Sequence, residues 1–296
     1  MSSKEIVVWH LSDSKPGHVN QSLGLIEELK RLVPTHHYTF ELKGSIFKDI
    51  ASIKHRGSKL PPPDLIIGTG HATHLPMLRT RKKFGGKCVV IMKPSLPLKW
   101  FDLAILPEHD GVSAENVLLT TGNLNKVKPS KTLDSKKGLI LIGGESKHFT
   151  WDSAAVYDQL KLLVKQHADI QWTLTSSRRT PVDFLDSISS LSDKVEIVPF
   201  EETDSLWVPR MLSSCAYVCV SEDSSSMIYE ALTAGGKVLT LSLSAKKKNG
   251  KMSRSLADLY GKSLISKVCA NLPENSQSFH ESLRIAKDLI KRLNLA

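Results

Sequence analysis

The sequence predicts an α/β protein with two doubly wound, Rossmann-like domains that face each other across a cleft. Three observations predict this fold. Short apolar runs alternate with amphipathic segments along the whole chain, which is the pattern of parallel sheets covered by helices on both faces. The alternation is interrupted once, by a polar, lysine-rich stretch over residues 123–137. A chain of 296 residues is also long enough to divide into two hydrophobic cores.

Residues 1–122 are predicted to form the N-terminal domain. The apolar runs of this half indicate strands at Ile6–Leu11, Tyr38–Leu42, Leu65–Ile67, Cys88–Met92, Leu103–Leu106 and Val117–Leu119. The clearest helix is expected over Gln21–Leu32, and Pro34 closes it because proline cannot continue a helix.

The stretch 123–137 is expected to be a linker, and residues 138–277 to form the second domain. Strands are predicted at Leu139–Ile142, Ile170–Thr175, Val195–Val198, Tyr217–Val220 and Val238–Leu241. Helices are predicted between them at Ala154–Gln166, Pro181–Leu191, Leu206–Ser213 and Ser226–Thr233. A last amphipathic helix, Phe279–Leu293 within residues 278–296, is expected to pack across the domains.

The composition is that of a folded protein with anionic partners. Hydrophobic residues make up 41% of the chain and charged residues 24%, and 40 Lys and Arg outnumber 30 Asp and Glu. That excess suits nucleic acid, acidic lipid or phosphorylated metabolites alike. The four cysteines have no CxxC spacing, and no apolar stretch approaches the roughly 20 residues needed to span a bilayer. We expect a cytoplasmic protein, either free or resting on the inner face of the membrane.

The turns that follow the strands should hold the chemistry, because ligands of open parallel sheets bind beyond the carboxyl ends of the strands. In the second half, Gly143-Gly144 suits close approach of a phosphate, although a tight turn without ligand also uses paired glycines. Ser225 and Ser226 begin a helix, where hydroxyls either cap it or hold a phosphate. The candidates for this region are Gly143, Gly144, Ser146, Lys147, Ser176, Ser177, Arg178, Arg179, Asp223, Ser225, Ser226, Met227 and Glu230.

The remaining charged candidates have ordinary explanations beside the functional ones. Arg178 and Arg179 present guanidinium groups that suit a phosphate, or form a solvated surface pair. Glu230 lies one turn into its helix, where its carboxylate can accept hydrogen bonds from both hydroxyls of a ribose. The alternative is an ordinary exposed glutamate. Lys246–Lys248, Lys251 and Arg254 attract acidic lipid or a phosphorylated acceptor, or form a solvated loop.

The first half has polar turns of its own. His18 follows the first strand and His71 the third, so both are candidates for acid–base chemistry or for gripping an acceptor, with Lys15, Gly17 and His74 beside them. A single histidine is more often structural. Asp110 is a second candidate base. Thr73 stands where a dinucleotide fingerprint needs its third glycine, which disfavours NAD.

Several enzyme classes lack their motifs in this chain. The sequence has no HExxH, DxD or paired-cysteine spacing, so no metal site is predicted. It has neither a GxSxG elbow nor a GxxxxGK[ST] loop, which argues against α/β-hydrolase and P-loop chemistry.

Six motifs in a fixed order resemble the bacterial members of the family named for a plant mitochondrial-fission, or elongated-mitochondria, protein. These motifs are WHLSDSKPGHVNQSLGL, GTGHATHLPML, FDLAILPEHD, LIGGESKHFTWD, TSSRRTP and VSEDSSSMIYEAL. Members of that family are often labelled nucleoside-diphosphate-sugar epimerases. Two departures from the family stand out: Glu145 replaces a usual proline, and an arginine is missing near Ser95.

The second-half motifs also resemble the donor site of GT-B glycosyltransferases, including the peptidoglycan transferase that adds N-acetylglucosamine and the non-hydrolysing UDP-sugar 2-epimerases. The resemblance implies that Gly143, Gly144 and Ser146 form the first donor loop. It further implies that Ser225 and Ser226 bind the diphosphate and Glu230 the ribose, while His18 matches an acceptor-side loop of the N-terminal domain.

Three functions follow from these resemblances. The first is a metal-independent glycosyltransferase of cell-envelope or surface glycan synthesis, with no cofactor besides its nucleotide-sugar donor and no nucleic-acid partner. Its acceptor would be phosphorylated or lipid-linked, and His18 or Asp110 would be the base. The second is an epimerase of the same fold. The third is a non-catalytic module that recruits a membrane or a protein.

Overall fold

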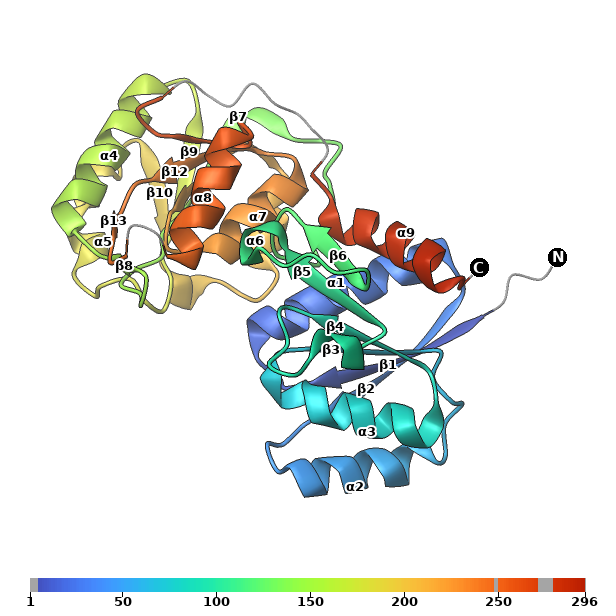
Figure 1. The fold of residues 1–296 in the computed structure, drawn as a ribbon. Helices are drawn as coiled ribbons and strands as arrows, with labels where there is room; N and C mark the ends of the chain where they lie inside the picture. Colours follow the sequence, from blue (N-terminus) through green and yellow to red (C-terminus); the bar gives the residue numbers. More distant parts are fainter. Residues whose placement is uncertain (1–4, 248–249, 271–278, 296) are drawn as a thin grey trace. The chain divides into compact units, whose positions relative to one another are not determined.

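The computed structural model describes residues 5–247, 250–270 and 279–295, and the chain forms two compact units (Figure 1). The first unit contains the residues up to Lys126 together with those from Glu281 onward, and the second contains Val127–His280. Each unit is built on a six-stranded parallel sheet with alternating helices, so the predicted α/β class is confirmed. The division falls inside the stretch expected as a linker, but residues 134–137 of that stretch belong to a strand.

The sheet of the first unit has the strand order β2-β1-β3-β4-β5-β6. Its strands are β1 (Ile6–Ser12), β2 (Thr35–Glu41), β3 (Leu65–Thr69), β4 (Lys87–Ile91), β5 (Leu103–Pro107) and β6 (Val117–Thr120). Every residue of β3 and β5 is buried, as expected for the inner strands of a sheet covered on both faces. Because β2 lies on one side of β1 and β3 on the other, the strand order reverses between β1 and β3.

Helices cover both faces of this sheet. On one face, α1 (Pro16–Leu32) and α9 (Glu281–Leu293) share a core with Ile6, Val8 and Ile67. On the other face, α2 (Ile46–Gly57) and α3 (His74–Phe84) pack over Trp9 and Phe40. The last predicted helix therefore exists as α9, and it belongs to the first unit.

The sheet of the second unit has the order β10-β9-β7-β11-β12-β14. Its strands are β7 (Asp134–Leu141), β9 (Gln171–Thr175), β10 (Val195–Val198), β11 (Cys215–Ser221), β12 (Lys237–Leu241) and β14 (Ile265–Lys267). Its helices are α4 (Ser153–Gln166), α5 (Phe184–Ser187), α6 (Trp207–Leu212), α7 (Ser225–Ala234) and α8 (Lys251–Gly261). Here the strand order reverses between β7 and β11, which marks the ligand crevice of an open sheet.

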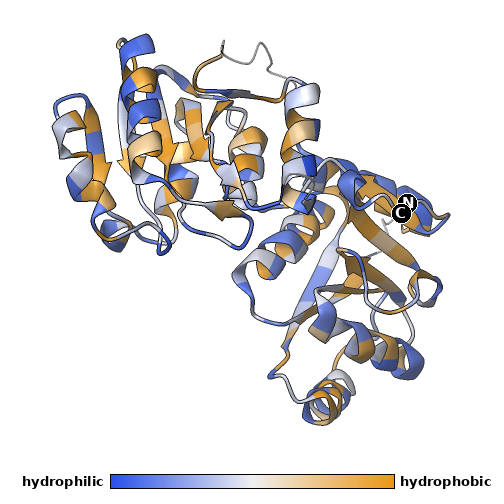
Figure 2. Ribbon diagram, turned by 60° about the vertical axis from the view of Figure 1, so that its left-hand side comes forward, coloured by the Kyte–Doolittle hydropathy of each residue, from blue (hydrophilic) through white to orange (hydrophobic). Residues whose placement is uncertain are grey.

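Apolar residues concentrate on the strands and on the helix faces that meet them, as the hydropathy colouring in Figure 2 shows. One prediction in this unit is wrong. The helix expected over Pro181–Leu191 is broken into the four residues of α5 and a 3₁₀ turn at Ser189–Leu191. Phe184, Ile188 and Leu191 are buried in the core, so tertiary packing fixes a segment that does not form a continuous helix.

Candidate functional site

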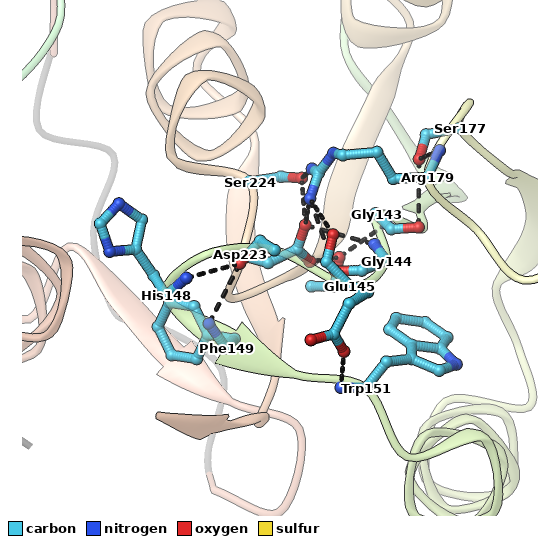
Figure 3. Close-up of polar contacts among 12 residues, drawn as sticks. Gly143, Gly144, Glu145, His148, Phe149, Trp151, Ser177, Arg179, Asp223 and Ser224 are labelled. Carbon is cyan, nitrogen blue, oxygen red and sulfur yellow. Dashed lines mark hydrogen bonds and ion pairs between the residues drawn. The ribbon is translucent and has the colours of Figure 1, made fainter. Parts of the chain in front are cut away.

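The loops that follow β7 and β11 are joined at the point where the strand order of the second unit reverses (Figure 3). The Gly143 N–H donates to Ser221 Oγ at 2.7 Å, and the Gly144 N–H donates to Asp223 Oδ2 at 3.2 Å. The Ser221 hydroxyl in turn donates to Asp223 Oδ1 at 2.7 Å. The Asp223 side chain is 0% exposed, so it is a fully buried carboxylate at the centre of the two loops.

Arg179, in the loop after β9, balances the charge of this carboxylate. Its Nη1 lies 2.6 Å from Asp223 Oδ2, and its Nη2 donates to Ser224 Oγ at 3.0 Å. The same guanidinium reaches the carbonyl oxygens of Gly144 and Glu145, both at 3.4 Å. We predicted Arg179 and Asp223 as ligand-binding residues; in the structure they bind each other and fix three loops in place (Figure 3).

The paired glycines are required by packing inside the protein. A Cβ on Gly143 would lie 2.2 Å from Asp223 Oδ2, and one on Gly144 would lie 1.9 Å from the carbonyl oxygen of Arg179. Glycine is therefore needed here because a carboxylate and a neighbouring backbone approach it closely. This corrects the prediction that the two glycines make room for a phosphate, since their N–H groups and the adjacent space are already used.

The start of α7 has open hydrogen-bonding capacity. Within the described residues, the N–H groups of Ser225, Ser226 and Met227 have no hydrogen-bond partner, and the side chain of Ser224 does not cap the helix. No acidic residue lies in the first turn of α7. The first-turn amides and the positive end of the helix dipole can therefore receive an anion. Glu230, the predicted ribose ligand, lies partly buried in the next turn.

Most of the predicted serines hold the loops in shape. Ser146 Oγ accepts the N–H groups of His148 and Phe149, and Ser176 Oγ accepts the N–H of Phe200 at 3.0 Å. Ser177 Oγ donates to the carbonyl oxygen of Gly143 at 3.1 Å. These hydroxyls set the geometry of the sheet edge through contacts within the protein.

Two predicted cations beside the loops remain available to a ligand. Lys147 and Arg178 are both exposed, and neither forms an ion pair with an acid in the described part of the chain. The Arg178 guanidinium lies 5.5 Å from the centroid of the Phe200 ring, which limits the directions it can take.

A two-stranded antiparallel ladder links the loop after β7 to the loop after β12. Its strands are β8 (Phe149–Thr150) and β13 (Ser244–Ala245). The Lys246 ammonium pairs with the Glu145 carboxylate and donates to the Ser146 carbonyl oxygen at 2.8 Å. The Lys246 ammonium and the Trp151 N–H lower the pKa of Glu145. Lys246, expected to attract an acidic partner, therefore has an internal one, whereas Lys248 lies outside the described residues.

In the first unit, His18 is held by a carboxylate that the sequence analysis did not single out. His18 Nδ1 lies 2.8 Å from Oδ2 of Asp13, whose side chain is only 5% exposed. The imidazole packs on Gly70, where a Cβ would lie 2.4 Å from the ring and where φ is +90°. Asp13 thus orients the imidazole through Nδ1, and within the described residues Nε2 has no hydrogen-bond partner. The sequence signal that would have indicated this pair is an aspartate five residues before the histidine, in the same turn after β1.

The other predicted residues of the first unit separate into two places. Gly17 and Lys15 lie at the start of α1, beside His18. Asp110 follows β5, which is three strands away from β1, or about 14 Å by strand spacing. The sheet therefore does not bring Asp110 to the end of β1 where His18 lies.

His71 and His74 line a cavity of about 380 Å³ at the carboxyl edge of the first sheet. Their rings are 5.7 Å apart, and His74 Nδ1 lies 3.2 Å from Ser95 Oγ. Burial, and to a smaller extent the neighbouring His71, lowers the pKa of His74 to about 4. His74 is therefore neutral near pH 7, and its Nε2 has no hydrogen-bond partner within the described residues. The cavity is lined by Gly44, Ile46, Asp49, His71, Ala72, His74, Leu75, Ser95 and Leu96.

A larger cavity, of about 620 Å³, lies at the opposite edge of the second sheet, near the amino ends of β9 and β10. Its lining mixes Lys137 and Lys194 with Asp193 and Glu196, so it offers no consistent charge to a ligand. Across the described ranges, no group of three or more His, Cys, Asp or Glu side chains is placed to hold a metal ion. No helix in the same ranges is both long and apolar enough to cross a bilayer.

Comparison with known proteins identifies relatives over most of the chain. Residues 16–293 match the family described as mitochondrial fission ELM1. The uncharacterized protein RP120 of Rickettsia prowazekii is 24% identical over 294 residues, which covers 77% of this chain and 81% of that protein.

Two solved structures show what the fold is similar to. The UDP-GlcNAc 2-epimerase of Neisseria meningitidis bound to UDP-GlcNAc aligns over 98% of this chain and 100% of its own, with a TM-score of 0.51 and 11% identity. AviGT4, a glycosyltransferase involved in avilamycin A biosynthesis, aligns over 98% and 97%, with a TM-score of 0.52 and 12% identity. The two units therefore have the fold of GT-B glycosyltransferases and epimerases, as the motifs predicted.

Proposed function

We propose that this chain, which belongs to the mitochondrial fission ELM1 family, is a metal-independent glycosyltransferase that takes its sugar from a nucleotide-sugar donor. The observation that carries the proposal is the open first turn of α7. Its unpaired amides lie where the strand order of the second sheet reverses, which is where open α/β sheets bind ligands. A diphosphate is the part of the donor that suits such a site.

The side chains around α7 support this assignment and narrow it. Lys147 and Arg178 supply exposed positive charge for the departing diphosphate, whereas Arg179 is committed to Asp223. The hydrogen bonds from the Gly143 N–H to Ser221 and from the Gly144 N–H to Asp223 fix the neighbouring backbone before a ligand arrives. The solved UDP-GlcNAc 2-epimerase that shares the fold is itself bound to UDP-GlcNAc, which favours the same class of donor here.

We assign proton removal from the acceptor hydroxyl to His18 of the first unit. A general base needs one ring nitrogen held by a partner and the other open to the substrate, and Asp13 provides that partner. Transfer then forms the bond between the acceptor oxygen and the anomeric carbon, breaks the bond to the diphosphate, and leaves the proton on His18 Nε2. Asp110 is assigned no part in this step.

Calorimetric titration with UDP, CDP, ADP and GDP sugars tests the donor site. Ser226→Glu places a carboxylate in the first turn of α7, where it stabilises the helix but repels a diphosphate. We expect this variant to lose at least about tenfold in affinity, or about 1.4 kcal/mol. The matched Ser226→Ala variant, which removes a hydroxyl and adds no charge, should bind within a few-fold of the parent. Equal binding by both variants, or no binding of any donor by the parent chain, contradicts the proposal.

An epimerase is the second candidate, because UDP-GlcNAc 2-epimerases are among the proteins that share the fold. Incubation with donor alone separates the two functions. An epimerised or released sugar in the absence of acceptor supports the epimerase. A donor that stays unchanged alone but is consumed once acceptor is added supports the transferase. A third candidate, a non-catalytic recruiting module, predicts no nucleotide affinity at all.

A further inference from the structure

The positive charge of this chain is concentrated in one segment. Residues 43–100 contain 12 Lys and Arg against two Asp, an excess of ten that equals the excess of the whole chain, 40 against 30. Both acids are turned inward: Asp49 accepts the N–H groups of Lys43 and Gly44, and Asp64 accepts the N–H of Val7. Outside this segment, basic and acidic residues are equal in number, so the segment alone accounts for the net charge of +10.

The same segment carries exposed apolar side chains at one end of the first unit. Phe47 is 85% exposed, Ile46 38% and Leu75 36%. Ile46 and Leu75 both line the cavity of about 380 Å³, so the first turns of α2 and α3 lie on the two sides of one hollow. We call these three residues the apolar rim. An exposed phenylalanine next to a cavity lined in part by Ile46, Leu75 and Leu96 is costly in water and marks a contact surface.

Basic side chains continue from this rim along both helices. On α2, Lys54 is seven positions after Phe47, so the two side chains lie on the same side of the helix. On α3, Arg79 and Lys82 follow Leu75 at four and seven positions and share its exposed side. Within the described residues, Lys54, Arg79 and Lys82 have no acidic partner. Each helix therefore presents an apolar first turn followed by solvated positive charge.

We propose that the α2–α3 end of the first unit docks onto an anionic lipid surface, with the apolar rim inserted among the lipids and the lysines and arginines over the headgroups. Charge complementarity favours an acidic surface, and the aromatic and aliphatic rim favours one with an apolar interior. A nucleic acid would satisfy the charges but would leave Ile46, Phe47 and Leu75 without an apolar partner. The residues of this face all belong to the first unit and include none of the Lys246 loop or of the α7 site, so docking does not depend on the nucleotide-sugar proposal.

Flotation of the full chain with vesicles tests the proposal. Vesicles of phosphatidylglycerol mixed with phosphatidylcholine should bind it, and vesicles of phosphatidylcholine alone should not. Replacing Lys54, Arg79 and Lys82 by glutamine should weaken binding by about fivefold for each charge, or about a hundredfold together. Phe47→Ser should weaken it by at least about tenfold, since the phenylalanine side chain would no longer be buried among the lipids. All four positions are exposed, so folding should persist, and an unchanged circular dichroism spectrum checks this.

Matched changes in the second unit provide the control. Val182 is 99% exposed, and Lys165 and Lys194 are exposed, so Val182→Ser and the double variant Lys165→Gln/Lys194→Gln remove an exposed apolar side chain and two exposed ammonium groups elsewhere. They should bind vesicles like the parent chain. Equal losses in both units would show non-specific attraction and overturn the proposal. Binding of a fluorescent RNA or DNA duplex through Lys54 and Lys82, with no vesicle binding, would overturn it in favour of a nucleic acid.

Discussion

In the second unit, the loops that follow β7, β9 and β11 are joined by the buried Asp223, whereas in the first unit the loops that follow β2, β3 and β4 enclose a cavity with an apolar rim. Both edges belong to six-stranded parallel sheets whose strand order reverses once. The difference teaches that one sheet edge can serve opposite purposes. In the second unit, the contacts of Asp223 with Arg179 and with the Gly144 N–H fix the backbone around α7. In the first unit, basic side chains without acidic partners in the described part of the chain and exposed apolar side chains are available to a binding partner.

The largest expected effect comes from filling the closest contact at the joined edge. Gly144→Ala would place a Cβ 1.9 Å from the Arg179 carbonyl oxygen, and backbone cannot move aside as a side chain can. We expect a loss of about 3 kcal/mol in the free energy of unfolding of the second unit. Denaturant unfolding measures it.

Gly17→Ala, at the start of α1, is the matched change in the first unit. A Cβ there meets nothing within 4 Å, so the variant should gain about 0.5 kcal/mol from the lower entropy of the unfolded chain. If the two alanines had the same effect, the contrast between a tightly joined and an open edge would be wrong.

Removing the central carboxylate should have the next largest effect. Asp223→Ala leaves the Arg179 guanidinium without its counter-charge and takes away the acceptor of the Gly144 N–H and the Ser221 hydroxyl. The expected loss is about 3 kcal/mol, reduced if Arg179 turns to solvent. In a double-mutant cycle with Arg179→Ala, a coupling energy of about 1 to 3 kcal/mol would confirm the pairing, and simple additivity would refute it.

Acid should weaken the first unit through His74. Burial lowers its folded-state pKa from 6.5 to about 4, so the unfolded chain binds the proton more tightly. The contribution of His74 to the free energy of unfolding is therefore fully present above pH 6.5. As the pH falls toward about 4, the free energy of unfolding decreases by about 2 to 3 kcal/mol. Thermal unfolding across this range should show a smaller decline for His74→Gln than for the parent. The exposed His55→Gln should follow the parent, and an identical decline in all three would exclude His74 as the cause.

The smallest effect is expected at the exposed ion pair of the ladder. Glu145→Gln removes the charge that pairs with Lys246 but keeps an oxygen for the Trp151 N–H. Exposed pairs contribute little to stability, so the melting temperature should stay within experimental scatter. A clear decrease in the melting temperature would mean that the β8–β13 ladder depends on this ion pair. Faster hydrogen exchange of the Lys246 N–H would then show that the ladder opens there.

Much of the fold is predictable from local pattern, because buried parallel strands are continuous apolar runs. Strand β10 is found over the predicted residues, and β1 and β5 are each one residue longer than predicted. Helices α2 and α3 were not predicted. Helix α2 buries only Asp49, Ile53 and Gly57, which is too few apolar residues to show helical periodicity. The strand start at 134–137 reads as a linker because all four residues are exposed.

Which loops lie at the reversal of strand order was predictable, but how they pair was not. The rule that ligands bind beyond strand ends selects the loops around Gly143 and Ser225 from topology alone, and the structure places both loops at that reversal. That Asp223 takes the Gly144 N–H and Arg179 depends on how three loops pack, which no local spacing encodes. Asp13 was missed for the same reason, since only the folded turn brings it to His18.

Helix α9 has a consequence for how the chain folds during synthesis. The second unit, Val127–His280, is continuous in sequence, whereas the first unit needs α9 to complete its core with Ile285, Ala286 and Leu289. On the ribosome, the second unit therefore has all its residues before the first does. Until the last helix emerges, the face of α1 that it covers stays exposed. A nascent chain arrested before α9 should bind chaperones through its first unit while its second unit already resists proteases.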